Sequence, residues 1–369
     1  MPGLRQAAVS TALALALALA AGCGGSSDTG GDDPLGEALA EVSSAPGTAL
    51  FVTWVDTARL REAADLPDST ESAIGDERWR YLVGLAAGSK LSDQVVSADY
   101  GFDPLAAERT IEVGTAPDDA VRFDGVDTDS VRAAFEKLGY EEDGDFLALG
   151  GEGELVEDTV DEFGVGMVGL NRLAFEGDSF AIGGYEEPVA AAIGRSGDPV
   201  ADAEGVAAAT DCIGSDALAA QLLDPQGAAA AAVALLAVAI EAPAAARDAV
   251  PEIVCAVGTP NGSLDEVGRC MEGNFNDGGL DPQTQQPYSD ILGEAEIEEG
   301  ESDGTPWVRA RFEPDPDDPV GRVFQMVQTQ ALSGPLGGTS PEALLGSGAG
   351  SPDQIAALQK QLQEACSGG

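Results

Sequence analysis

Short segments of strand-like and helix-like pattern alternate along most of this chain. Residues 49–55 form an apolar run that is typical of a buried strand, and Asp56 stands where it can cap a following helix. The clearest helix is predicted over residues 127–139, where apolar residues recur at helical spacing and a glycine ends the segment. Residues 173–182 alternate around a Gly-Asp pair and predict a hairpin.

The C-terminal half of the chain mixes the same elements. Residues 206–223 are rich in alanine and leucine and predict a helix. Residues 233–240 predict a core strand that pairs with residues 253–257, and an alanine-rich helix is the alternative for the first of these two segments. The segments 291–298 and 307–312 alternate as antiparallel strands.

These patterns predict an α+β fold of short antiparallel sheets and hairpins with packed helices, arranged in two subdomains. Strand, helix, hairpin and helix follow one another in each half, so a relation by duplication stays open, although no residue-level repeat supports it. The predicted organisation is a signal peptide at 1–22, a flexible tether at 23–33, an N-terminal α+β subdomain at 34–225, a C-terminal α+β subdomain at 226–333, a Gly/Ser/Pro-rich linker at 334–352 and a terminal helix at 353–369.

A cysteine motif ends the first apolar stretch of the chain. Arg5 precedes an Ala/Leu core over residues 7–21, which is too short to remain in a bilayer as a spanning helix. The core runs into Leu19-Ala-Ala-Gly-Cys23, which resembles the lipobox of a bacterial, actinobacterial-type lipoprotein precursor, with Ala20 where leucine is more common. The resemblance implies cleavage before Cys23 and a membrane anchor of at least two acyl chains on its sulfur. An ordinary secretory signal is the alternative.

The chain is strongly acidic. It contains 65 Asp and Glu residues, 18 Lys and Arg residues and no histidine, which gives a formal net charge of -47 at pH 7. Such a surface repels nucleic-acid phosphates and anionic lipid headgroups alike. We therefore expect no nucleic-acid partner, and attachment to the extracytoplasmic face of the cell membrane must come from the lipid on Cys23.

Four further cysteines follow in the C-terminal half, at Cys212, Cys255, Cys270 and Cys366. An even number of cysteines in an exported protein predicts two disulfides. We favour Cys212 with Cys255 and Cys270 with Cys366, because Cys255 lies in a predicted strand and Cys366 follows a terminal helix that needs attachment. A local bond between Cys255 and Cys270 is the alternative. The wide spacing and the absence of histidine argue against zinc.

No catalytic motif stands out. The absence of histidine from the sequence excludes Ser-His-Asp and Cys-His catalysis as well as imidazole metal sites. Residues 164–169 match a glycine-rich dinucleotide pattern, but no buried strand precedes them, so we interpret them as a loop. Carboxylate clusters at 141–143 and 186–187 are typical of a solvated surface.

Two acidic segments could bind calcium in principle. Asp124, Asp127 and Asp129 are close together, and residues 313–318 are dense in carboxylates. Neither segment has the glycine and glutamate spacing of an EF-hand loop, and Asp127 is more simply a helix cap. We therefore predict no metal site, no cofactor and no catalytic residue.

Taken together, the sequence favours a lipid-anchored cell-envelope protein that is not an enzyme and that binds an envelope protein or a small ligand. One alternative is the substrate-binding lipoprotein of an ABC importer, which would be anchored in the same way and would have two lobes joined by a hinge. The second alternative is a carboxylate-based hydrolase, since two acidic side chains suffice for glycoside hydrolysis.

Overall fold

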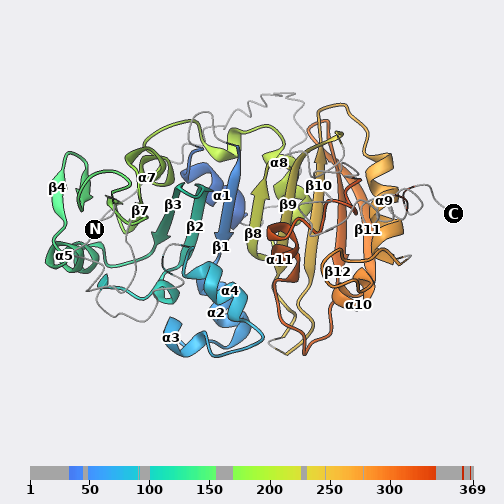
Figure 1. Ribbon diagram of the computed structural model, residues 1–369, viewed down its shortest axis with the longest axis horizontal. Coiled ribbons are helices and arrows are strands. Elements are labelled where there is room, and N and C mark those ends of the chain that lie inside the picture. Colours follow the sequence, from blue (N-terminus) through green and yellow to red (C-terminus); the bar gives the residue numbers. More distant parts are fainter. Residues whose placement is uncertain are drawn as a thin grey trace, which may run out of the picture. The chain divides into compact units, whose positions relative to one another are not determined.

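A large antiparallel sheet organises the described part of the chain. The computed structural model describes residues 33–44, 49–89, 91, 100–154, 169–225, 231–245, 247–276, 278–337, 360 and 366. Twelve strands within these ranges join in the order β11-β12-β10-β9-β8-β1-β2-β3-β7-β6-β5-β4 (Figure 1). Each neighbouring pair is antiparallel.

Helices and strands are mixed along the described part of the chain. In the N-terminal half they are α1 (Pro34–Glu41), β1 (Phe51–Val55), α2 (Thr57–Ala64), α3 (Thr70–Ala73), α4 (Arg80–Ala86), η2 (Pro104–Ala106), β2 (Arg109–Thr115), β3 (Asp118–Asp124), α5 (Thr128–Lys137), β4 (Glu141–Asp143), β5 (Phe146–Ala148), β6 (Arg172–Glu176), β7 (Ser179–Gly183), α7 (Glu186–Ala192), η3 (Val200–Asp202) and α8 (Val206–Ile213). In the C-terminal half they are β8 (Ala217–Leu223), β9 (Val233–Glu241), β10 (Glu252–Gly258), α9 (Asp265–Asn276), α10 (Tyr288–Leu292), β11 (Ala295–Ser302), β12 (Thr305–Phe312) and α11 (Arg322–Gln328).

The fold is mixed α and β, as expected, but the prediction of short sheets is wrong. The ladder between β1 and β8, from Phe51↔Leu223 to Val55↔Ala219, joins the strands of both halves into a continuous sheet. The predicted subdomain boundary after residue 225 falls between β8 and β9, which are themselves hydrogen-bonded neighbours. The described residues from Asp33 onward belong to one compact unit.

One predicted helix is wrong in its second part. The helix expected over residues 206–223 ends at Ile213, Gly214 adopts φ of 85°, and the remaining residues form β8. All residues of β8 except the last are buried, because the strand lies in the middle of the sheet with helices on both faces. Tertiary packing therefore overrides the helix propensity of its alanines and leucines.

Helices cover both faces of the sheet, and alternate strand residues enter different cores. Trp54 packs with α1, α7 and α8 on what we name the α8 face. Val55, the next residue, packs on the opposite face with α2, α4 and α9 to α11. Val121 and Phe123 extend this second face, named the α4 face, toward α5. This period of two is the pattern expected for a sheet that is buried on both sides.

The two outer strands of the sheet carry many carboxylates. All three residues of β4, Glu141, Glu142 and Asp143, are exposed. The other outer strand, β11, contains glutamates at positions 296, 298, 299 and 301, while Ile297 packs against the core. Charged side chains on outer strands discourage pairing with the sheet of another molecule.

Candidate functional site

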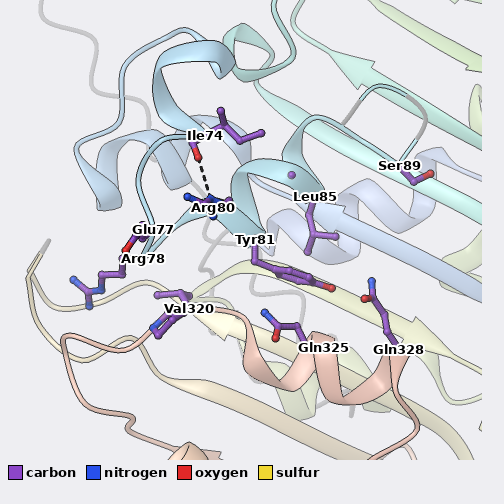
Figure 2. A pocket seen from close by; sticks show the side chains of 12 residues that line it. Ile74, Glu77, Arg78, Arg80, Tyr81, Leu85, Ser89, Val320, Gln325 and Gln328 are labelled. Atoms are coloured by element: carbon purple, nitrogen blue, oxygen red, sulfur yellow. Dashed lines mark hydrogen bonds between the residues drawn. The ribbon is translucent and has the colours of Figure 1, made fainter. Parts of the chain in front are cut away.

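A groove opens on the α4 face between α4 and α11 (Figure 2). Its volume is about 470 Å³, which lies within the range of small-ligand sites. α4 packs on β1 and β2, whereas α11 packs on β9 and β10. One wall of the groove therefore comes from the N-terminal half of the chain and the other from the C-terminal half.

Tyr81 on α4 lies between the two walls. Its ring centroid is 6.2 Å from that of Phe324 on α11. Gly321 packs directly on the ring, since a Cβ added there would lie 2.7 Å from Cδ1 of Tyr81. Burial raises the pKa of Tyr81 to about 12, and a side-chain hydrogen bond with Gln328 partly opposes this rise. The tyrosine hydroxyl is therefore protonated at neutral pH and available as a donor.

Basic side chains line one end of the groove. Glu77, Arg78 and Arg80 lie at this end, away from Gln328 (Figure 2). Nε of Arg80 donates a hydrogen bond to the carbonyl oxygen of Ile74 at 3.2 Å. The side chains that line this end comprise two guanidinium groups and one carboxylate, so the lining itself has a net positive charge. Asp76 lies beside it and accepts a hydrogen bond from the backbone N–H of Arg78 at 2.9 Å, and the whole chain has a net charge of -47.

Gly84 leaves space in the α4 wall. It lies inside the helix, and a Cβ added at this position would meet no atom within 4 Å. A glycine inside a helix costs about 1 kcal/mol relative to alanine. Here the missing side chain widens the groove.

Glu252 fixes the start of α11 and with it the second wall of the groove. Its carboxylate, 1% exposed, accepts hydrogen bonds from the backbone N–H groups of Gly321, Arg322 and Val323 at 2.8, 3.2 and 2.8 Å. Burial raises the pKa of Glu252, and the backbone hydrogen bonds only partly offset this effect. The first turn of α11 is thereby tied to β10 in the sheet.

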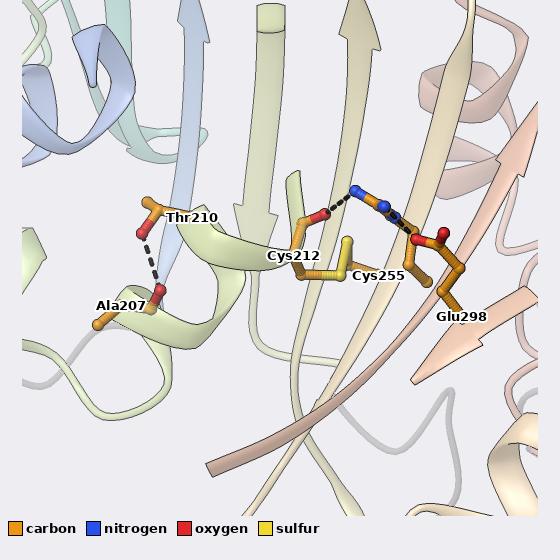
Figure 3. The surroundings of a disulfide bond; sticks show 6 residues. Ala207, Thr210, Cys212, Cys255 and Glu298 are labelled. Carbon is orange, nitrogen blue, oxygen red and sulfur yellow. Dashed lines mark hydrogen bonds and ion pairs between the residues drawn. A yellow bond between two sulfur atoms is a disulfide. The ribbon is translucent and has the colours of Figure 1, made fainter. Parts of the chain in front are cut away.

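The four C-terminal cysteines form the two disulfides that we favoured from the sequence, Cys212–Cys255 and Cys270–Cys366. Cys212 lies on α8 and Cys255 on β10, so the bond ties this helix to the α8 face of the sheet (Figure 3). The carbonyl oxygen of Cys212 also accepts a hydrogen bond from Arg309 at 3.1 Å, and Arg309 forms an ion pair with Glu298.

Two of the aspartates considered as calcium ligands, Asp124 and Asp127, have other roles in the structure. Asp124 is buried and forms ion pairs with Arg109 and Arg122. Burial acts to raise the pKa of Asp124, but the hydrogen bond from Arg109 and the charge of Arg122 outweigh it, and the pKa is lowered. Asp127 caps α5 by accepting from the backbone N–H of Ser130 at 3.2 Å, as predicted.

The remaining acidic candidates do not meet at the groove. Glu313 pairs with Arg311 at 2.7 Å, and the exposed residues 141–143 form β4. Glu186 lies 3.4 Å from Nε of Arg172. Within the described ranges, no cluster of three or more His, Cys, Asp or Glu side chains could hold a metal ion.

Two sequence features fall outside the described part of the chain. They are Cys23 with its preceding apolar run, and residues 164–168 of the glycine-rich pattern. Most of the predicted tether, linker and terminal helix also lies outside it, apart from residues 33, 334–337, 360 and 366. Of the described helices, none has both the length and the apolar character needed to cross a bilayer.

The groove itself was missed from the sequence. Tyr81 and Gln328 are far apart in the chain, and no local pattern links them. Two signals were present nonetheless. The segment Arg78-Trp79-Arg80 is a concentration of positive charge in a chain poor in basic residues, and Gly84 interrupts a helical pattern.

Comparisons of this chain with protein-family models, with characterised proteins and with solved structures find no match.

Proposed function

We propose that this chain is a lipid-anchored cell-envelope protein that acts without catalysis, by binding a ligand in the groove between α4 and α11. The observation that carries the proposal is the groove itself, with its walls from two halves of the chain, its mixed polar and apolar lining and its volume of about 470 Å³. The lipobox-like motif at Cys23 supplies the anchor. The two disulfides are consistent with an oxidising, extracytoplasmic location.

The two alternative functions have less support. An importer protein with a hinge between two lobes is difficult to reconcile with a sheet that continues from β1 into β8. A carboxylate-based hydrolase needs two facing acidic groups, and among the residues that line the groove Glu77 is the sole carboxylate.

We also infer that the two halves are related by duplication. In support, strands β1, β2 and β3 are followed in the sheet by β7 and β6, and strands β8, β9 and β10 are followed by β12 and β11. A helix comes before the hairpin in each half, α5 in the first, with β4 and β5 between, and α9 in the second, with α10 between. A ligand groove between the halves would then have arisen where two similar units meet.

The anchor can be tested by replacing Cys23 with alanine. Loss of the acylated sulfur should move most of the protein from the membrane pellet to the soluble fraction in a host that processes lipoproteins. Ser26→Ala in the predicted tether is the matched control and should stay in the pellet. Equal membrane retention of Cys23→Ala and wild type would contradict the lipid anchor.

The groove can be tested with a variant that fills it. Gly84→Leu should remove a co-purifying small molecule that native mass spectrometry detects on the full-length wild-type protein. The same substitution should raise the free energy of unfolding by up to about 1 kcal/mol, because leucine is the better helix former. Lost binding could therefore not be ascribed to misfolding.

Gly84→Ala is the matched control for that variant. It should give the same gain in stability but retain the ligand, since a single methyl group fills little of the groove. A molecule that stays bound to Gly84→Leu with unchanged occupancy would place the binding site elsewhere.

A further inference from the structure

We propose that the ligand of the groove is a short peptide with apolar side chains and a free C-terminal carboxylate. This inference rests on the proposed function and adds the chemical class of the ligand. The groove offers such a peptide an end lined by Arg78 and Arg80, apolar surface from Val320 and Leu85, and amide groups along one wall (Figure 2).

The positive end fits a carboxylate. Arg80 donates through Nε to the carbonyl of Ile74, which holds the side chain at the rim of the groove. Its guanidinium forms no ion pair with any carboxylate of the described residues. The planar guanidinium offers several N–H donors in a fixed arrangement, which suits bidentate binding of a carboxylate.

The α11 wall fits the backbone of an extended peptide. Gln325 and Gln328 are three positions apart on α11 and therefore lie on the same side of the helix. Both are exposed, and both line the groove. Each side-chain amide has a carbonyl acceptor and two N–H donors. One group of Gln328 is hydrogen-bonded to Tyr81, and the remaining groups of the pair can match the alternating C=O and N–H groups of a peptide.

The groove also fits small apolar side chains. Val320, which precedes α11, contributes apolar surface beside Arg78, and Leu85 on α4 contributes it toward Gln328 (Figure 2). The backbone N–H of Val320 donates to the carbonyl of Arg78 at 2.9 Å, so the chain before α11 is fixed against the opposite wall. A fixed apolar surface of this kind favours burial of an aliphatic side chain.

Two observations argue against other ligand classes. A saccharide would use an open aromatic face for stacking, whereas the Tyr81 ring is half-buried, with Gly321 against it and the tilted ring of Phe324 at 6.2 Å between centroids. A polyanion would be repelled by the net charge of -47. One carboxylate on an otherwise apolar peptide brings a single negative charge to the local positive end and avoids most of this repulsion.

The test uses full-length protein in detergent and a set of acetylated tripeptides of alanine, leucine and valine. Each peptide is prepared with a free C-terminal carboxylate and as the C-terminal amide. We expect binding by calorimetry to be at least tenfold stronger for the carboxylate form. Arg80→Gln should reduce that preference to less than threefold, whereas Gly84→Leu should weaken binding of both forms more than tenfold.

Arg269→Gln, at an exposed arginine on α9 outside the groove, is the matched charge control and should leave the preference unchanged. Equal affinity for the two peptide forms, a preference that survives in Arg80→Gln, no binding of any peptide, or binding of a neutral N-acetylglucosamine trimer in place of the peptides would each overturn the peptide assignment. If no peptide binds while Gly84→Leu still removes a co-purifying molecule, the peptide assignment fails and the proposed function stands.

Discussion

Replacing Cys212 and Cys255 together by alanine is expected to lower the free energy of unfolding by about 4 kcal/mol. The bond closes a loop with a sequence separation of 43, and the loop-closure entropy that it removes from the unfolded chain corresponds to about that value. Both cysteines are fully buried, so alanine leaves no unsatisfied polar group in the core. Urea unfolding of the oxidised proteins, compared at equal pH and salt, measures the difference.

Reduction of the wild type provides the control for this prediction. Wild-type protein in reducing agent should lose at least as much stability as the double variant, because both disulfides open. In the double variant, the same reagent should act only on the second bond, Cys270–Cys366. A loss below about 1 kcal/mol in the double variant would show that the unfolded chain gains little freedom when this loop opens.

Glu252→Ala is expected to lower the free energy of unfolding by about 3 kcal/mol or more. The substitution leaves the N–H groups of Gly321, Arg322 and Val323 without their acceptor. A buried donor without a partner costs about 1–3 kcal/mol. Because α11 is one wall of the groove, the variant should also weaken ligand binding, which calorimetry on the folded protein can separate from the loss of stability.

Glu252→Gln tests the charge of this residue through the pH dependence of stability. The pKa of Glu252 is raised above its ordinary value of 4.5, chiefly by burial, so the folded state holds the proton more tightly than the unfolded state does. The contribution of Glu252 to stability is therefore present at low pH and is lost as the pH rises through the raised pKa. The stability of wild type minus that of Glu252→Gln should fall over this range. A difference that rises with pH would contradict the burial argument.

Local interactions explain which parts of the fold could be predicted from the sequence. Asp127 caps α5 through residues three positions away, so the signal for that helix lies within a few neighbours. The hairpin of β6 and β7 is likewise defined by its own turn. The strand around Cys255 could be predicted because residues 253–257 are all apolar.

Non-local contacts explain what could not be predicted. β8 becomes a strand because β1 and β9 flank it, and its alanines carry no local record of those partners. The size of the sheet could not be predicted for the same reason, because the ladder between β1 and β8 joins residues from different halves of the chain. The groove depends on how Tyr81 and Gln328 meet across two packed helices, and on Glu252 holding the second of those helices. Local patterns in one sequence do not indicate which residues from distant parts of the chain come into contact.

The position of β1 in the middle of the sheet has a consequence for how the protein is made. One side of β1 pairs with β2, which begins at Arg109, but the other side pairs with β8, which begins only at Ala217. The hydrogen bond from Gln221 to Thr53 joins residues 168 positions apart. Until β8 has emerged, a growing chain presents an apolar strand with a row of open N–H and C=O groups, a template for unwanted pairing. A fragment that stops ahead of β8 would keep that open strand permanently, so the N-terminal half made alone should aggregate where the whole chain does not.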